Sequence, residues 1–283
     1  MEKSYKERKR PAERKPRSGD RPARPRDEVR EVTDECLVSG RNAVRELLAS
    51  GRDIDKIYTR RGEREGSINL ILGMAAERRI PIVEVERQKL DAMTGGARHQ
   101  GVVAMAAERN YATVDDILAL AEERKEKPFI VILDGVEDPH NLGAVIRSAE
   151  CCGVHGVIIP KRRAVGLTGT AAKASAGAIE HMLVAKVTNL ASTIDELKER
   201  GLWLFCADMG GDAYYRTDMT CGAAIVLGSE GFGVSHLVKE KCDFTVSIPL
   251  YGNVNSMNVS CAATVILAEV ARQRNTGGDD IGK

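Results

Sequence analysis

The stretch FIVILDGVEDPHNLGAVIRSAECCGVHGVIIP, residues 129–160, decides the fold class. Its two ends, 129–135 and 156–160, are short apolar runs rich in β-branched residues, which is typical of strands buried on both faces. A helix is predicted between them over about 140–152, with Pro139 in the first turn. Its core-facing residues recur at three- and four-residue spacing: Leu142, Val145, Ile146 and Ala149. A strand–helix–strand unit of this kind predicts two parallel strands joined by a crossover helix.

The same alternation continues toward the C-terminus. Further strands are predicted at 202–208, 223–229 and 244–250, and further helices at about 170–176, 192–200 and 256–272. In the last of these helices the apolar face is predicted to consist of Met257, Cys261, Val265 and Ala268. The fold class is therefore α/β, with a parallel sheet that helices cover on both faces.

The residues in front of this unit predict a smaller α/β domain over 36–108. CLVSGRNAVRELLASGRDIDKIYTRRG indicates strand, helix and strand, SINLILGMAAERRIPIVEVE repeats helix and strand, and HQGVVAMAA begins a third strand. Residues 109–127 are a linker whose amphipathic helix ends before Pro128. The larger unit then spans 128–274, and the tail 275–283 is expected to be disordered.

The N-terminal arm, residues 1–35, interleaves Lys and Arg with proline and has almost no apolar residues. It is expected to be disordered, and its charge favours a nucleic-acid partner, although a solubilising tail explains the same composition. The whole chain of 283 residues has a net charge of only +1, so any nucleic-acid surface on the folded part must be local.

Cysteine usage and hydropathy restrict the class of protein. The seven cysteines include no C-x-x-C pair, which argues against a disulfide framework and against a zinc or other metal site. Most of them, including Cys151 and Cys152, are expected to be reduced core residues of a cytoplasmic protein. No apolar run approaches the roughly 18 residues of a membrane span.

Three strand ends carry glycine and polar residues where ligands of open α/β sheets bind. The first is LDGVEDPHN, followed on the predicted helix by Arg147; Gly143, one turn earlier, is expected to leave open space beside the guanidinium group. The second, AIVLGSEGFGVS, contains Glu230, and the third is SIPLYGNVNSMNVS. A solvated surface Arg147 and a turn residue Glu230 are the plain alternatives. No glycine spacing matches a dinucleotide or P-loop fingerprint, so a Rossmann-type enzyme is unsupported.

A basic loop follows the strand 156–160 in PKRRAVGLTGTAAKAS. Its cations are suited to a nucleic-acid phosphate backbone, and an ordinary solvated charge run remains the alternative. The residues concerned are Lys161, Arg162, Arg163 and Lys173.

Together, DPHNLGAVIRSAECCGV, VLGSEGFGVS and IPLYGNVNSMNVSCA resemble the three motifs of the SpoU/TrmH family in the SPOUT class of RNA ribose 2′-O-methyltransferases. The front unit, through VSGRNAVRELL and RHQGVVA, resembles the L30e-like RNA substrate-binding domain of that family. This order of domains is most similar to the enzymes that methylate a guanosine of 23S rRNA. The alternatives within this interpretation are a tRNA 2′-O-methyltransferase and a non-catalytic RNA-binding module.

The resemblance implies a trefoil knot in the C-terminal part of the sheet, a homodimer, and S-adenosylmethionine as cofactor. It implies catalytic-site roles for Arg147, Asn141, Glu230, Ser256 and Asn258. It implies cofactor contacts from Leu227, Gly228, Ile248, Leu250 and Met257, the last standing where the family usually has leucine. Ser256 is expected to cap the final helix and Asn258 to lie inside its first turn.

Overall fold

The computed structural model describes residues 36–62, 66–107 and 109–275. The two segments predicted to be disordered lie outside these ranges, apart from Asn275, which is the last residue of a helix. Across the described ranges, each helix is too short or too polar to serve as a membrane span.

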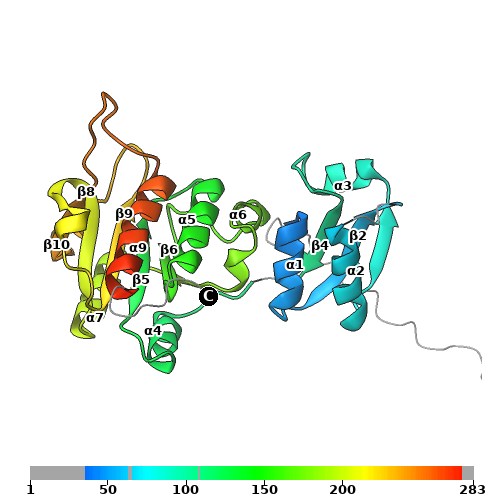
Figure 1. Ribbon diagram of the computed structural model, residues 1–283, viewed down its shortest axis with the longest axis horizontal. Helices are drawn as coiled ribbons and strands as arrows, with labels where there is room; N and C mark the ends of the chain where they lie inside the picture. Colours follow the sequence, from blue (N-terminus) through cyan, green and yellow to red (C-terminus); the bar gives the residue numbers. More distant parts are fainter. Residues whose placement is uncertain (1–35, 63–65, 108, 276–283) are drawn as a thin grey trace, which may run out of the picture. The chain divides into compact units, whose positions relative to one another are not determined.

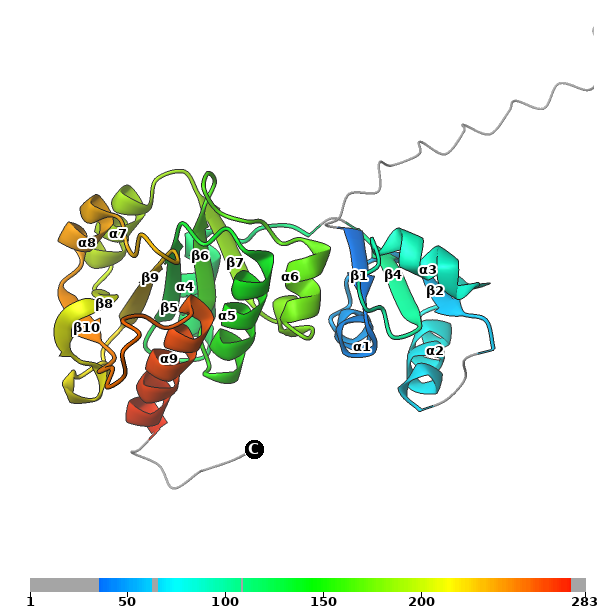
Figure 2. The same ribbon diagram turned by 90° about the horizontal axis from the view of Figure 1, so that it is seen from above.

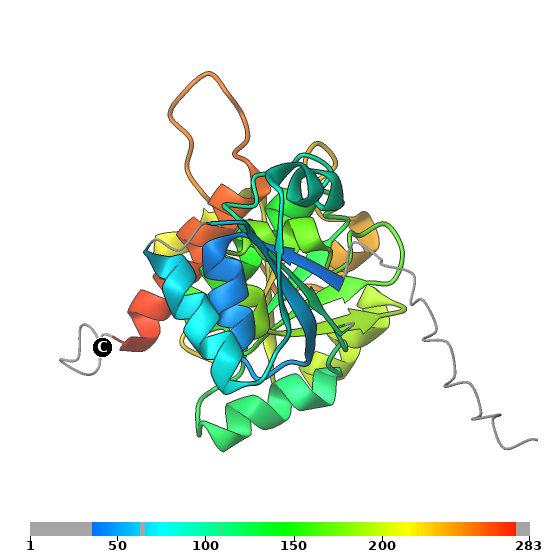
Figure 3. The same ribbon diagram turned by 90° about the vertical axis from the view of Figure 1, so that its right-hand side faces the viewer.

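The front unit is built on a mixed four-stranded sheet with the order β1-β4-β2-β3. Its strands are β1 (Leu37–Ser39), β2 (Ile54–Arg60), β3 (Ile82–Val85) and β4 (Val102–Ala106). The helices α1 (Arg41–Ala49) and α2 (Ser67–Glu77) pack on one face, as Figure 3 shows in blue and cyan. The helix α3 (Arg87–Met93), which periodicity did not predict, covers the other face through Leu90.

The larger unit contains a six-stranded sheet with the order β10-β8-β9-β5-β6-β7, and all of its pairings are parallel, which confirms the predicted sheet. Its strands are β5 (Phe129–Asp134), β6 (Gly156–Pro160), β7 (Leu183–Val187), β8 (Trp203–Ala213), β9 (Ala223–Gly228) and β10 (Phe244–Ser247). The strand β7 was not predicted. It lies at the edge of the sheet, and only Val184 and Ala185 of its residues are buried, so its apolar run is short.

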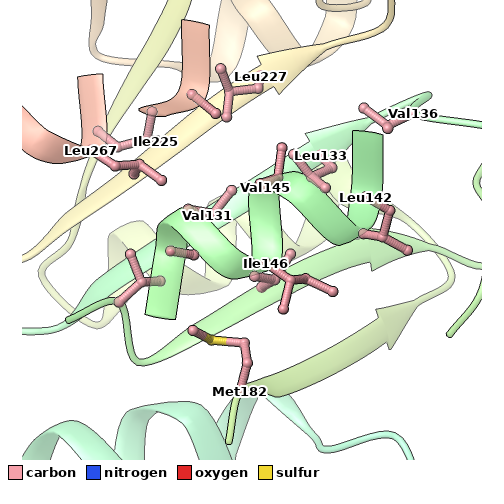
Figure 4. Close-up of a cluster of buried hydrophobic side chains, with 14 of the residues drawn as sticks. Val131, Leu133, Val136, Leu142, Val145, Ile146, Met182, Ile225, Leu227 and Leu267 are labelled. Atoms are coloured by element: carbon pink, nitrogen blue, oxygen red, sulfur yellow. The ribbon is translucent and has the colours of Figure 1, made fainter. Parts of the chain in front are cut away.

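Helices cover both faces of this sheet (Figures 1 and 2). One face packs against α5 (Pro139–Cys151) and α9 (Val259–Asn275), with the short α6 (Gly169–Ala174) beside α5. The other face packs against α4 (Val114–Glu123), α7 (Leu190–Glu199) and α8 (His236–Lys241). Figure 4 shows the core between α5 and the strands, where Val145 and Ile146 meet Val131 and Leu133.

Local signals set the start of α5. The Asp138 carboxylate accepts a hydrogen bond from the His140 backbone N–H at 2.9 Å, and Pro139 occupies the first helical position, where no N–H is needed. The predicted helix 140–152 is therefore confirmed to within a residue at each end.

Several predictions about this unit are wrong. The helix predicted over 256–272 begins at Val259, and its buried residues are Val259, Ala263, Ile266, Leu267 and Val270. Met257 and Cys261 are exposed instead, because Met257 precedes the helix and Cys261 lies on its outer side. Cys151 is also exposed, and Cys206 is the one fully buried cysteine among the described residues.

Gly143 does not open space beside Arg147. A Cβ atom at Gly143 would lie 2.5 Å from the carbonyl oxygen of Ala171 and 2.6 Å from the Cβ of Ala174. The missing side chain therefore allows α5 and α6 to approach closely, which is a packing role.

Candidate active site

A cavity of about 650 Å³ lies at the carboxyl ends of β9 and β10, beside the middle of β8. This is the edge of a parallel sheet at which ligands are expected, and the volume is in the usual range for small-molecule sites. The cavity is also bordered by the start of α9 and by the loop 248–258, the orange excursion in Figures 1 and 3. All five residues predicted to contact a cofactor line it: Leu227, Gly228, Ile248, Leu250 and Met257.

The turn after β9 is closely packed. Gly228 has no room for a side chain, because a Cβ atom there would lie 1.9 Å from the carbonyl carbon of Gly233. The backbones of Ser229 and Gly233 exchange two hydrogen bonds, at 3.1 and 3.0 Å, which close the turn. The Asp134 carboxylate, at the end of β5, accepts from the Ser235 N–H at 2.8 Å and ties the turn to the neighbouring strand. The turn therefore requires glycine at position 228, and the same residue also lines the cavity.

Three predicted polar residues from three separate motifs meet at the rim of this cavity. The Asn141 side-chain amide donates to Glu230 Oε1 at 3.1 Å, and the Asn258 amide donates to Asn141 Oδ1 at 3.0 Å. The Asn258 amide also donates to Glu230 Oε1. Asn141 is buried, whereas Glu230 and Asn258 are exposed. Both bonds to Glu230 use Oε1, so Oε2 can accept a hydrogen bond from a bound molecule.

Asn258 is the N-cap of α9, which corrects the expectation that it lies inside the first turn. Its Oδ1 accepts from the backbone N–H groups of Ser260 at 2.9 Å and Cys261 at 3.4 Å. Its amide nitrogen meanwhile donates to Asn141 and Glu230, so both ends of the side chain are used. Capping therefore explains Asn258 and not Ser256, which lies in the preceding loop and lines the cavity.

Arg147 does not join this cluster. It is exposed on α5 and does not line the cavity, and in the described part of the chain no carboxylate lies within ion-pairing distance of it. The helix that carries it is nevertheless joined to α9, because Ser148 Oγ lies 2.7 Å from Thr264 Oγ1. This bond joins the two helices, and the exposed Arg147 side chain on α5 remains available to a molecule that approaches from outside.

The predicted basic loop lies after β6. Lys161, Arg162 and Arg163 are exposed, and Arg163 has a left-handed backbone with φ of 56°. Lys173 is on α6 and partly buried, and this burial lowers the pKa of its ammonium group. None of the four lines the cavity, so any role in binding is separate from the cavity itself.

Asp208 is a cavity residue that the sequence analysis missed. It lies on β8 and accepts from Lys239 Nζ at 2.5 Å, a contact that raises the pKa of Lys239. The signal was present, because Asp208 ends the predicted strand 202–208 and an acid at the carboxyl end of a parallel strand is a candidate ligand contact. Its carboxylate can accept hydrogen bonds from hydroxyl or ammonium groups.

Family models match both units of the chain in order. Residues 128–268 match the SpoU rRNA Methylase family, and residues 37–112 match the family described as RNA 2′-O ribose methyltransferase substrate binding. The chain is 49% identical over 243 residues to a putative TrmH family tRNA/rRNA methyltransferase, YacO, of Bacillus subtilis, covering 86% of this chain and 97% of that protein. It is 48% identical to a protein of the same description from Staphylococcus haemolyticus, covering 87% of this chain and 99% of that one.

A solved structure supports the same assignment. The SpoU methyltransferase AviRb of Streptomyces viridochromogenes, in complex with the cofactor AdoMet, superposes with a TM-score of 0.71 at 26% identity, covering 84% of this chain and 90% of that one. The sheet, the cavity at its carboxyl edge and the three motifs that meet there agree with these matches. The chain therefore belongs to the SpoU rRNA methylase family of RNA methyltransferases, and its cofactor is S-adenosylmethionine.

Proposed function

We propose that the chain transfers a methyl group from S-adenosylmethionine to a ribose 2′-hydroxyl of RNA, and that the target is a guanosine of 23S rRNA. The observation that carries the proposal is the meeting of Asn141, Glu230 and Asn258 at the rim of the cavity. These residues come from three motifs far apart in the chain, and they converge beside the cavity lined by the five residues proposed to contact the cofactor.

The cavity residues are chemically suited to the cofactor. Leu227, Ile248 and Met257 give an apolar wall that can pack against an adenine ring, and Asp208 and Glu230 supply carboxylates for hydroxyl and cationic groups. When bound, S-adenosylmethionine supplies an electrophilic methyl carbon on a sulfonium. The task left to the protein is to place the 2′-oxygen in line with that carbon and to favour loss of the hydroxyl proton.

In this proposal Asn258 is a positioning residue. Its amide nitrogen donates to Asn141 and Glu230, and its side-chain oxygen accepts from the Ser260 N–H, so it fixes both Glu230 and the start of α9. Glu230 keeps one carboxylate oxygen for the substrate or cofactor, and Asn141 holds it in place from the buried side. Ser256, exposed in the adjoining loop, is placed to hydrogen-bond a ligand in the cavity.

Arg147 is proposed to stabilise the alkoxide that forms on the 2′-oxygen and to contact the adjacent phosphate. A guanidinium normally stays protonated, so electrostatic stabilisation is chemically easier than proton removal. Because Arg147 does not line the cavity of its own chain, we include the homodimer in the proposal, with the reaction site near the subunit interface. The exposed apolar side chains of Tyr251 and Val254, in the loop beside the cavity, support such a covered surface.

The remaining parts of the proposal follow the family. They are the trefoil knot at the carboxyl edge of the sheet, an L30e-like front domain over 36–108, a linker over 109–127, a catalytic domain over 128–274, and a cytoplasmic location. The exposed Lys161, Arg162 and Arg163, with Lys173 on α6, are proposed to contact the RNA backbone. Methylation of tRNA is the second candidate, because the curated relatives carry both substrates in their description.

The test of the proposed chemistry is transfer of tritiated methyl groups to bacterial rRNA. Arg147→Ala is expected to lower turnover by about 10²–10³, the usual effect of removing one stabilising donor, with cofactor binding unchanged. Arg200→Ala, which removes an exposed arginine elsewhere in the same unit, is the control and should retain full turnover. Near wild-type turnover in folded Arg147→Ala would refute the assignment.

The substrate is tested separately by mapping 2′-O-methylation across 23S rRNA and tRNA in a deletion strain. Loss at a single 23S guanosine is expected. Loss confined to tRNA would replace the first substrate by the second and leave the chemistry intact.

A further inference from the structure

The front unit has its own depression of about 370 Å³, which the reaction described above does not use. It lies between the end of β2, the helix α3 and the loop that leads from α3 to β4. Arginine dominates its lining, through Arg60, Arg87 and Arg98, and Asp91 is the one acid among the lining residues. Ala97 is the only apolar side chain in that set, so the depression offers nothing for a hydrophobic ligand to pack against.

The loop Arg98–Gly101 is held in a defined conformation by His99. This side chain is buried, with 7% of the residue exposed, and its Nδ1 accepts from the Gly101 N–H at 3.0 Å. The proton is therefore on Nε2, which donates to Asp91 Oδ1 at 3.0 Å. His99 thus occupies one oxygen of Asp91, and Arg87 approaches the other at 3.7 Å.

Gln100 fixes the same loop to the first turn of α1. Its backbone has a φ of 53°, its side-chain oxygen accepts from the Arg41 N–H at 2.9 Å, and its carbonyl accepts from Arg41 Nε at 3.0 Å. On the other side, the Gly101 carbonyl accepts from the Arg60 N–H at 2.9 Å. The backbone around Arg98 is therefore fixed from three directions, while the Arg98 side chain is exposed.

No carboxylate lies within ion-pairing distance of Arg98 among the described residues. The guanidinium groups of Arg87 and Arg98 therefore share the depression with a single lining carboxylate, Asp91, which His99 already engages. Guanidinium groups are planar, remain charged, and bind phosphate oxygens through two parallel hydrogen bonds. A preformed loop reduces the entropy that an anion must overcome when it binds there.

We propose that this depression binds a phosphodiester of the RNA substrate, outside the nucleotide that is methylated. The proposal rests on the proposed function only in taking RNA as the substrate. It gives the match of residues 37–112 to a substrate-binding family a defined location on the domain. The lack of aromatic side chains in the lining argues against base stacking, so binding here is expected to be independent of sequence.

The test is the affinity of the full-length chain for a 23S rRNA transcript, measured over a series of salt concentrations. Arg98→Ala and Arg87→Ala are each expected to weaken binding about tenfold, the scale of a lost charge-assisted hydrogen bond. Each should also reduce the slope of log affinity against log salt by about one. Arg98→Lys keeps the charge without the planar fork and should restore part of the affinity.

Arg45→Ala is the matched control. It removes the same charge from the same domain, but Arg45 lies outside the depression, exposed on α1 and paired with Glu46 at 2.9 Å. The affinity of Arg45→Ala for the transcript should stay within about twofold of the wild type, because Arg45 lies outside the depression and the loss of its exposed ion pair should disturb the domain little. If Arg98→Ala and Arg87→Ala behave like Arg45→Ala, the proposal is wrong.

Two further measurements separate this proposal from the proposed function. In the first, polyglutamate and a phosphodiester polymer are compared as competitors for the bound RNA. Equal displacement by polyglutamate would show that the depression binds anions in general, and it would overturn the proposal of a phosphodiester site. In the second, cofactor binding and methyl transfer are measured on the same variants. If the Arg98→Ala and Arg87→Ala variants methylate RNA normally and bind the transcript as the wild type does, only the phosphodiester site is refuted. If they lose affinity for the transcript while the wild-type chain does not methylate RNA, the proposed reaction is refuted and the RNA-binding site is supported.

Discussion

Asn258 offers the sharpest test of the site, because its two ends serve different purposes. Its oxygen caps α9, and its amide nitrogen donates to Asn141 and Glu230. In Asn258→Asp the cap is retained, since aspartate is an equally good capping residue, but both amide donors are lost. The substitution also places a second carboxylate beside Glu230.

The expected cost can be worked from these contacts. Leaving the oxygen of the buried Asn141 without its donor costs about 1 kcal/mol. Two carboxylates about 4 Å apart add about 1 kcal/mol in a water-like environment, and the exposure of Glu230 favours this lower limit. The free energy of unfolding of Asn258→Asp should therefore fall by about 2 kcal/mol at pH 7.

The pH dependence of stability distinguishes carboxylate repulsion in Asn258→Asp from a simple loss of hydrogen bonds. Mutual repulsion raises the pKa of each carboxylate in the folded state above its unfolded value, so the folded state gains stability as the pH falls. A repulsion of about 1 kcal/mol corresponds to a rise of about 0.7 in pKa, so the deficit against wild type should shrink between about pH 6 and pH 4. Urea unfolding can be followed through Trp203, the one tryptophan of the chain, which lies on β8 of the catalytic unit.

Asn189→Asp is the control, since Asn189 caps α7 through Ala191 and Ser192 and has no carboxylate among its hydrogen-bond partners in the described residues. It should cost little and show no such recovery at low pH. Equal behaviour of the two variants at both pH values would refute the role given to the Asn258 amide.

Two other outcomes follow from the packing. Gly143→Ala should lower the free energy of unfolding by about 1–3 kcal/mol, because its Cβ would lie 2.5 Å from the Ala171 carbonyl oxygen. Gly73→Ala in α2 is the control and should stabilise the protein, because a Cβ there would have nothing within 4 Å. The midpoints of urea unfolding measure both effects, and an unchanged midpoint for Gly143→Ala would contradict the close approach of α5 and α6. The His155 side chain is 0% exposed, and burial lowers its pKa, so the unfolded state takes up the proton first and stability should fall as the pH drops below about 6.5. His155→Gln should flatten that slope, and an unchanged slope would assign the acid sensitivity to another group.

The local patterns predicted most of the framework. Apolar runs and glycine or proline boundaries located β5, β6, β8, β9 and β10. The signal is strongest in β5, β6 and β9, whose residues are almost all buried and therefore form a continuous apolar run. The elements that were missed, β7, α3 and α8, are short or lie at an edge, where half-buried residues leave a weak pattern.

The last helix shows where periodicity fails. An apolar helix can carry apolar residues along more than one face. The spacing predicts a buried face that includes Cys261, whereas the face that is buried includes Ala263 and Leu267. Packing against the sheet and α5 selects the buried face, and that contact joins residues more than a hundred positions apart. Likewise, the sequence shows a glycine at position 143, but its role in packing follows only from the position of α6 against α5.

The sequence by itself determined the α/β class, the parallel sheet, the three motifs and, through them, the family. The tertiary structure decided how the motif residues are used. It brought Asn141, Glu230 and Asn258 together, made Asn258 a helix cap, left Arg147 outside the cavity, and added Asp208 to it. The physical reason is that strand and helix signals arise from neighbouring residues, whereas hydrogen-bond partners across a sheet edge depend on the order of strands, which no local pattern contains.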